Sequence, residues 1–346
     1  MIYRQLGQTD LQTSLICLGT MTFGEQNTEA DGHAQMDMAL DYGVNFFDTA
    51  ELYAIPPKAD TYGVTERIIG SWFKQRANRD KVILASKVAG PGAGWVDHIR
   101  GGPRLNREHM TKALEDSLKR LQTDYIDLYQ IHWPERSTNF FGQLGYQHNA
   151  DEQVIAIEET LAVLNDFVAA GKVRHIGISN ETPWGVMQYL MLAEKHNWPR
   201  IVSIQNPYNL LNRSFEVGLS EMAIREKVGL LAYSPLGFGV LSGKYLNQQK
   251  PEGARLSLFP DYTRYSNENG IAATQAYAEL AQQTNLTPTQ LALAFINSRD
   301  FTTANIIGAT NIEQLKENIE SVNIKLNEQN IDEINTIHSQ YTIPCP

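Results

Sequence analysis

VILASK at residues 82–87 and DYIDLYQIH at residues 124–132 flank the stretch REHMTKALEDSLKRL at 107–121. Apolar residues recur in the middle stretch at the spacing of an α-helix, whereas β-branched and aromatic residues dominate the two flanking runs. A helix between two strands returns the chain, so that the second strand runs in the same direction as the first. This part of the chain therefore predicts a β–α–β unit with parallel strands.

The same alternation of short apolar runs and helical stretches repeats about eight times along the chain. The predicted strands are LICLG at 15–19, VNFFD at 44–48, VILAS at 82–86, DYIDLYQIH at 124–132, VRHIGIS at 173–179, IVSIQ at 201–205, GLLAYS at 229–234 and NIIGA at 305–309. The predicted helices cover 30–42, 64–75, 107–121, 153–170, 183–197, 214–226, 271–284 and 311–322, with Asn106 and Asn311 as N-caps. Eight such units predict an α/β fold, a single (β/α)8 TIM barrel.

Two segments lie outside this repeat. Residues 2–14, IYRQLGQTDLQTS, predict an N-terminal β-hairpin that closes the bottom of the barrel, and NEQNIDEINTIHSQY at 327–341 predicts an extra C-terminal helix. No linker or low-complexity tract interrupts the chain. We therefore expect residues 1–346 to form one domain.

Composition excludes several classes of function. The 346 residues carry a formal net charge of −10, which argues against a protein that mainly binds nucleic acid or anionic membranes. No run approaches the length of apolar sequence that a membrane helix needs. The chain has only two cysteines, Cys17 and Cys345, and no HExxH motif, so we expect no disulfide framework, no metal site and a cytoplasmic location. Nothing in the sequence fixes the quaternary state, for which we expect a monomer or a weak homo-oligomer.

Polar residues collect where the predicted strands end, which is where the loops of a barrel of this kind build an active site. Asp48, Lys87 and His132 end three strands, and Tyr53 follows Asp48 closely. Hydride addition to a carbonyl leaves negative charge on the oxygen, so the reaction needs a proton donor and groups that polarise that oxygen. Tyr53 suits the acid, Lys87 suits the cation that lowers the pKa of the phenol, Asp48 suits its partner, and His132 suits a donor that orients the carbonyl.

Each of the four residues also has a purely structural interpretation. Asp48 can cap a turn, Tyr53 can pack in a loop, Lys87 can be a surface charge and His132 can be a satisfied turn residue. Singly these interpretations are the better ones, but together and within matching motifs the four residues indicate carbonyl chemistry.

Eight sequence blocks resemble the aldo-keto reductases, and within that family the bacterial Tas-like branch. The blocks run from Gly19 to Asn318 and are GTMTFG, FFDTAELY, SKV, DLYQIHWP, IGISNET, IQNPYNLLNR, AYSPLGFGVLSGKY and IIGATNIEQLKENI. The resemblance implies an oxidoreductase that reduces aldehydes or ketones with NADPH. It assigns the roles given above to the four residues Asp48, Tyr53, Lys87 and His132, which we call the tetrad. The tetrad residues match the family pattern at all four positions.

The expected cofactor site differs from a Rossmann fold, because no GxGxxG motif follows the first strand. Ser179, Asn180 and Gln205 carry groups that suit a nicotinamide carboxamide, and Tyr233 offers a face for the ring. The resemblance assigns them these roles, with a loop at 234–244 covering the pyrophosphate. The further cofactor residues that we expect in the first and seventh strand loops are Thr20, Met21, Ser234, Pro235, Leu236, Gly237, Gly239, Leu241 and Lys244.

The adenosine end is expected at the last helix. Gly308 and Thr310 lead into a helix whose N-terminus can receive a 2′-phosphate, and Gln314 and Asn318 lie one turn apart on it. Many family members have a lysine beside this turn, which this chain lacks, so we expect Arg255 to supply the cation. NADPH is therefore favoured over NADH.

The sequence says little about the identity of the substrate. Loops 88–105 and 134–152 are long, and long loops at a barrel mouth shape the pocket. Met21, Trp95, Trp133, Phe140, Phe141 and Tyr146 either line an apolar cleft or only pin these loops to the barrel. Two other functions stay open: an NADPH-binding regulatory subunit with little turnover, and another barrel enzyme with a phosphorylated ligand.

Overall fold

Eight parallel strands close into a barrel in the computed structural model, which describes all 346 residues. The strands are β3 (Ile16–Gly19), β4 (Phe46–Asp48), β5 (Ile83–Val88), β6 (Ile126–Ile131), β7 (Val173–Ser179), β8 (Ile201–Pro207), β9 (Gly229–Tyr233) and β10 (Thr302–Ile307). They follow one another around the barrel in chain order, and β10 pairs with β3 to close it. The predicted (β/α)8 barrel is thereby confirmed. That residues 1–346 form one domain stays a prediction.

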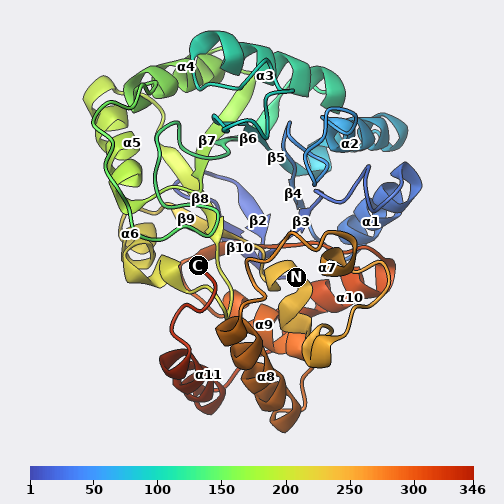
Figure 1. The fold of residues 1–346 in the computed structure, drawn as a ribbon. Coiled ribbons are helices and arrows are strands. Elements are labelled where there is room, and N and C mark those ends of the chain that lie inside the picture. The colour runs from blue at the N-terminus through green and yellow to red at the C-terminus, as the bar shows by residue number, and fades with distance from the viewer.

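A ring of helices surrounds the strands (Figure 1). The ring consists of α1 (Glu29–Asp41), α2 (Val64–Arg76), α3 (Arg107–Leu121), α4 (Ile157–Ala169), α5 (Pro183–His196), α6 (Leu219–Arg225), α9 (Pro288–Asn297) and α10 (Ile312–Glu320). The side chain of Asn106 accepts a hydrogen bond from the His109 N–H, and that of Asn311 accepts one from the Gln314 N–H. Both residues therefore cap their helices as predicted.

The seventh barrel helix is not the one that the sequence predicted. The predicted helix at 271–284 corresponds to α8 (Glu268–Gln283). Between β9 and β10, however, the helix that contacts β10 is α9, and α8 packs on α9. The sequence TPTQ at 287–290 carried the signal, because Thr287 and Gln290 form a capping box ahead of Pro288. Almost all of α9 is buried, so it lacks the one-sided apolar pattern used to find the other helices.

Smaller differences concern element boundaries. The helix predicted at 153–170 begins only at Ile157, so residues 153–156 extend the preceding loop. The stretch predicted at 214–226 divides into a 3-10 turn at Ser214–Val217 and the short helix α6. An unpredicted single turn, α7 (Arg255–Leu258), lies in the long segment that follows β9.

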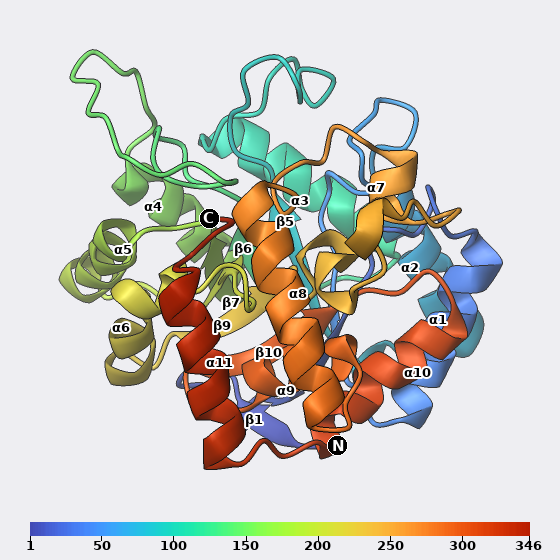
Figure 2. The same cartoon turned by 60° about the horizontal axis from the view of Figure 1, so that its bottom comes forward.

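The two ends of the barrel are built differently. The hairpin of β1 (Tyr3–Gln5) and β2 (Gln12–Ser14) lies at one end, and Leu6 beside it is fully buried in the barrel interior, as the predicted bottom closure requires. The long loops and α7 lie at the opposite end, which is uppermost in Figure 2. The predicted C-terminal helix is α11 (Glu328–Gln340), which packs on α8. None of the helices combines the length and apolar character needed to cross a bilayer.

The barrel interior is layered. An apolar layer lies next to Leu6 and is formed mainly by small and aliphatic side chains, with Cys17, Phe46, Ala85, Leu128, Leu231 and Ala304 among its members. Side chains on one strand face the same side at every second residue. Asp48, Lys87 and Gln130 stand two residues beyond Phe46, Ala85 and Leu128, so the strand period places them in the next layer, toward the open end.

Candidate active site

The four predicted catalytic residues meet at the C-terminal end of the barrel. Asp48 ends β4, Lys87 lies in β5, His132 directly follows β6, and Tyr53 lies in the loop after β4. The Nζ atom of Lys87 is 2.6 Å from Oδ2 of Asp48, 2.8 Å from the carbonyl oxygen of Thr49 and 3.4 Å from the Tyr53 hydroxyl oxygen. The rings of Tyr53 and His132 lie edge to face with centroids 5.8 Å apart.

Two glutamines hold the other oxygen of Asp48. Nε2 of Gln205 donates to Oδ1 of Asp48 at 2.8 Å, and Nε2 of Gln130 donates to the same oxygen at 3.3 Å. Both side chains are buried. Gln130 was not among the predicted site residues, although it stands two positions before His132 and therefore on the inward face of β6 with Leu128. Charge-assisted hydrogen bonds on one oxygen leave the second oxygen of Asp48 directed at Lys87.

Lys87 remains a cation at this buried position. Burial acts to lower the pKa of Lys87, but the charges and hydrogen bonds of Asp48 and Tyr53 raise it above its usual value. Such compensation is what a buried charge requires, because an ammonium without a partner would lose its proton. The amine therefore carries its charge within hydrogen-bonding distance of the phenol.

The phenol of Tyr53 remains protonated. Burial raises the pKa of Tyr53, and the opposing effect of Lys87 is too small to reverse this shift. The sequence-based expectation of a lowered pKa was therefore right about the contribution of Lys87 and wrong about the net direction. The physical reason is that Tyr53 is almost completely withdrawn from water, which disfavours the phenolate.

His132 is a neutral imidazole. Burial and the charge of Lys87 lower the pKa of His132 well below its usual value. Its Nδ1 atom is buried without a hydrogen-bond partner, and Asn180 donates a hydrogen bond from Nδ2 to the backbone carbonyl oxygen of His132 at 2.9 Å. A neutral ring keeps one N–H with which to donate to a ligand oxygen.

Glu51 is a fully buried carboxylate that the sequence analysis did not single out, two residues before Tyr53. Its Oε1 accepts from the Ala89 N–H at 2.8 Å and from Nη2 of Arg100 at 2.8 Å, while Oε2 accepts from Nη1 of Arg100 at 2.6 Å and from the Tyr62 hydroxyl at 2.8 Å. It therefore ties the loop that carries the phenol to the end of β5 and to loop 88–105. Its only signal in the sequence was its place within FFDTAELY.

The residues predicted for the nicotinamide adjoin the tetrad. Ser179 donates from its hydroxyl to the carbonyl oxygen of Gln205 at 2.7 Å, and the Tyr233 hydroxyl donates to Oδ1 of Asn180 at 2.6 Å. Ser179, Asn180 and Gln205 are buried at the ends of neighbouring strands β7 and β8. Part of their hydrogen-bonding capacity is thus used to hold one another and His132.

Thr20 and Met21 lie on the other side of the tetrad. The hydroxyl of Thr20 is buried and donates to the backbone carbonyl oxygen of Asp48 at 2.9 Å. Met21 packs against the cluster that contains Tyr53. Thr20 therefore supports the end of β4 directly.

The loop after β9 presents backbone and two cations without acidic partners. Gly237 and Gly239 have φ values of 51° and 88°, which glycine adopts without strain. Lys244 and Arg255 form no ion pair with any acidic side chain. Burial lowers the pKa of each, and the charge of Arg255 lowers that of Lys244 further. The other residues predicted for this loop lie just before the 3-10 segment Gly237–Ser242 or within it; they are Ser234, Pro235, Leu236 and Leu241.

The predicted adenosine end lies after β10. Oε1 of Gln314 accepts from the backbone N–H and the hydroxyl of Thr310 at 3.0 and 3.1 Å, and Nδ2 of Asn318 donates to the Gly308 carbonyl oxygen at 3.1 Å. These bonds fix the turn ahead of α10. Arg255, the cation expected for this end, lies on α7 in the segment that follows β9, and its charge acts to lower the pKa of Tyr53 against the effect of burial.

The aromatic residues of the long loops form one cluster beside the tetrad. Trp133 contacts the ring of His132 with centroids 4.9 Å apart, and its centroid lies 5.1 Å from that of Trp95 and 5.7 Å from that of Phe141. Met21, Phe140 and Phe141 pack against the cluster that contains Tyr53 and Trp133. Tyr146 stays apart, since it is 57% exposed and its ring neighbour is His148. The aromatics other than Tyr146 thus pin the loops and also adjoin Tyr53.

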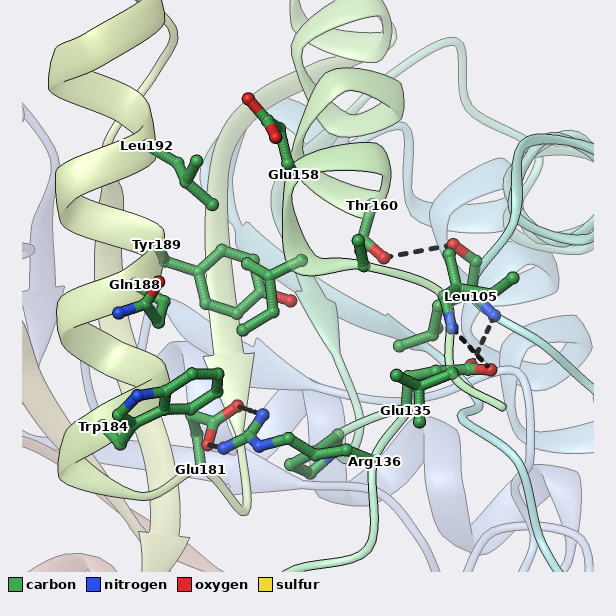
Figure 3. Close-up of a pocket in the computed structure, with 15 residues that line it drawn as sticks. Leu105, Glu135, Arg136, Glu158, Thr160, Glu181, Trp184, Gln188, Tyr189 and Leu192 are labelled. Carbon is green, nitrogen blue, oxygen red and sulfur yellow. Dashed lines mark hydrogen bonds and ion pairs between the residues drawn. The ribbon is translucent and has the colours of Figure 1, made fainter. Parts of the chain in front are cut away.

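A separate hollow of about 290 Å³ lies between α4 and α5 and contains no tetrad residue (Figure 3). Its charged side chains are paired within the protein, as in the contacts of Arg136 with Glu181 and of Arg104 with Glu135. Figure 3 shows the first of these pairs beside Trp184, over whose ring Arg136 lies at 4.7 Å. This hollow therefore offers no free charge and no chemistry of its own.

Comparisons with known proteins agree with this geometry. The sequence model of the Aldo/keto reductase family matches residues 15–339. The chain is 51% identical over 346 residues to Protein tas of Escherichia coli (strain K12), with 100% of both chains covered. It is 35% identical over 338 residues to the uncharacterized oxidoreductase YrpG of Bacillus subtilis (strain 168), covering 97% of this chain and 96% of YrpG.

A third relative, the aldo-keto reductase YhdN of the same Bacillus strain, is 31% identical over 343 residues, covering 97% of this chain and 93% of YhdN. The resemblance noted in the sequence, to the family and to its Tas proteins, is confirmed. This chain belongs to the aldo/keto reductase family, whose members are oxidoreductases that generally act on small-molecule carbonyl compounds with nicotinamide cofactors.

Proposed function

We propose that this protein reduces aldehydes or ketones by hydride transfer from NADPH, with Tyr53 as the general acid. The observation that carries the proposal is the buried contact of 3.4 Å between Nζ of Lys87 and the Tyr53 hydroxyl, with Asp48 holding the amine at 2.6 Å. A charge so close to a phenol stabilises the phenolate as it forms, and burial keeps the proton in place until then.

The four residues divide the work of reduction. NADPH, when bound, supplies the hydride. His132 donates a hydrogen bond to the carbonyl oxygen of the substrate and orients it toward Tyr53. Tyr53 gives its proton to that oxygen as negative charge develops, and the ammonium of Lys87 stabilises the phenolate left behind. Asp48, fixed by Gln130 and Gln205, keeps Lys87 charged throughout.

The chain has groups that fit NADPH. Lys244 and Arg255 are partly buried cations without acidic partners, which suits the phosphates of a dinucleotide. Ser179, Asn180 and Gln205 suit the carboxamide, and the face of Tyr233 suits the nicotinamide ring. The sites for the adenine and the 2′-phosphate are proposed at the turn from Gly308 to Thr310, with Gln314 and Asn318 on α10 and with Arg255 as the cation.

A direct comparison of NADPH and NADH tests the cofactor. We expect a clear preference for NADPH in kcat/KM with one aldehyde. The preference should shrink when Arg255 is replaced by Gln, because the extra phosphate then loses a charge-assisted contact worth about tenfold or more in affinity. A preference for NADH in the unmodified protein would refute this choice of cofactor.

The Tyr53→Phe variant tests the acid. We expect carbonyl reduction to fall by about 100- to 10,000-fold, the usual contribution of a general acid, while NADPH still binds. Undiminished turnover would remove Tyr53 from this role. NADPH binding by the unmodified protein, without oxidation by any of a panel of aldehydes, ketones and quinones, would instead favour a regulatory subunit.

We further propose that the protein is cytoplasmic and that it is a monomer or a weak homo-oligomer. The cytoplasmic location is supported by its two cysteines, both free and buried. Size-exclusion chromatography with light scattering measures the quaternary state.

A further inference from the structure

Arg264 is a cation at the mouth of the barrel that the proposed mechanism does not use. It lies in the segment between α7 and α8, and its guanidinium stands 5.8 Å from the ring centre of Phe141 and 5.7 Å from that of Phe238. Burial raises the pKa of Tyr233 at the end of β9, and the charge of Arg264 acts in the opposite direction, which places Arg264 close to that hydroxyl.

Arg264 has no acidic side chain as a partner. Several other partly buried arginines do have one, as in the pairs of Arg100 with Glu51 and of Arg120 with Glu66, whereas Arg255 does not. The space beside Gly142 is shared by Arg264 and the end of the chain. A Cβ atom at Gly142 would lie 3.2 Å from Nε of Arg264 and 3.4 Å from a carboxylate oxygen of the terminal residue Pro346, with which Arg264 forms no ion pair. A partly buried guanidinium that forms no ion pair keeps its donors for an incoming anion.

A chain of aromatic rings links Arg264 to the tetrad, with Trp133 fully buried and Phe141 partly exposed. Phe141, which touches the guanidinium, lies 5.7 Å from Trp133 between ring centres, and Trp133 lies 4.9 Å from His132. A ligand whose carbonyl reaches His132 and Tyr53 would place its apolar body against the partly buried Phe140 and Phe141 and its far end at Arg264. Lys244 and Arg255 remain for the cofactor phosphates.

We infer that Arg264 binds a carboxylate of the substrate, so that the substrate is an anionic carbonyl compound with a flat apolar body between its two polar ends. The inference rests on the proposed carbonyl reduction. Arginine meets a carboxylate with two parallel hydrogen bonds, and such charge-assisted contacts raise affinity by about 10- to 100-fold. Arg264 would thus be a specificity residue that leaves the proton transfer itself unchanged.

Ligand binding without turnover tests the site first. Benzoate and benzamide have the same ring and differ in charge, and the quenching of tryptophan fluorescence in the presence of NADP+ measures their affinities. We expect benzoate to bind about 10- to 100-fold more tightly than benzamide. Arg264→Gln should abolish this difference without weakening benzamide, and Arg264→Lys should keep part of it. Lys250→Gln, which removes an exposed cation ahead of α7, should leave it intact.

Two results would overturn the inference. One is equal binding of benzoate and benzamide by the unmodified protein, which would indicate that the chain end at Pro346 satisfies Arg264. The other is a benzoate preference that survives in Arg264→Gln while the melting temperature is unchanged. If Arg264→Gln has a lowered melting temperature, the test uses Arg264→Lys in its place. A stable Arg264→Lys variant that shows no benzoate preference at all would count against the inference.

Turnover separates this inference from the proposed function. We expect 4-carboxybenzaldehyde to be reduced with a kcat/KM about 10- to 100-fold above that of its methyl ester, and Arg264→Gln to remove the advantage through KM. Reduction of both aldehydes with equal efficiency would leave the proposed function standing and overturn the role of Arg264. Reduction of neither, with a benzoate preference that Arg264→Gln abolishes, would refute the proposed function and support the anion site.

Discussion

Replacing Lys87 by Met tests the contact on which the proposed chemistry depends. The amine is fully buried, and its Nζ atom lies 3.4 Å from the hydroxyl oxygen of Tyr53. At that distance and an effective dielectric constant of about 20, a full negative charge on the phenol is stabilised by about 4.9 kcal/mol, and half a charge by about 2.4 kcal/mol. Since each 1.36 kcal/mol is a factor of ten in rate, Lys87→Met should reduce kcat by about 60- to 4,000-fold.

The assay is the loss of NADPH absorbance with one aldehyde at saturating concentration, together with NADPH affinity measured by fluorescence. Stability needs its own control, because Lys87→Met leaves the carboxylate of Asp48 buried without its cation. Breaking such a pair costs about 3–5 kcal/mol. The double variant Asp48→Asn with Lys87→Met removes both charges, so we expect it to regain most of that stability and none of the activity.

The reasoning fails if Lys87→Met keeps more than a tenth of the original kcat. It also fails if the double variant, once folded as stably as the original protein, turns over as fast as the original. Either result would show that the phenol releases its proton without help from the amine.

The remaining predictions concern pH and the loop that carries Tyr53. Tyr53 must be protonated to act, burial raises its pKa, and His132 stays neutral because burial and Lys87 lower its pKa. kcat/KM for reduction should therefore change by less than about twofold between about pH 6 and pH 9 and fall only at higher pH, as Tyr53 loses its proton. An inflection near pH 6.5 would contradict the neutral state of His132. Glu51→Gln should cost about 3–5 kcal/mol in the free energy of unfolding, because it breaks the buried pair with Arg100, and it should lower kcat as the loop loosens. Glu221→Gln, which breaks the exposed pair with Arg225, should cost at most about 1 kcal/mol in urea unfolding, and equal effects of the two changes would refute the role of burial.

The sequence predicted the eight strands and the positions of the tetrad because both follow from local rules. Because all strands of a parallel barrel end on the same side, Asp48, Lys87 and His132 must lie at one end of it, independently of the conformation of the loops. The rules failed for α9, where burial on all sides hides the helical pattern, and at Ile157, where the start of α4 lacks a capping side chain. Both failures arose where packing partners, and not the segment itself, set the boundary.

By itself the sequence determined that parallel strands close into a barrel and that a phenol, an amine, a carboxylate and an imidazole gather at its mouth. Only the tertiary structure decided which other groups touch them. Gln205 and Asp48 are 157 residues apart and meet at 2.8 Å, and the opposing charges and burial that set the pKa of Tyr53 come from three separate segments. Such contacts depend on the register between strands and on how deeply each side chain is buried. The spacing of residues along one segment determines neither of these.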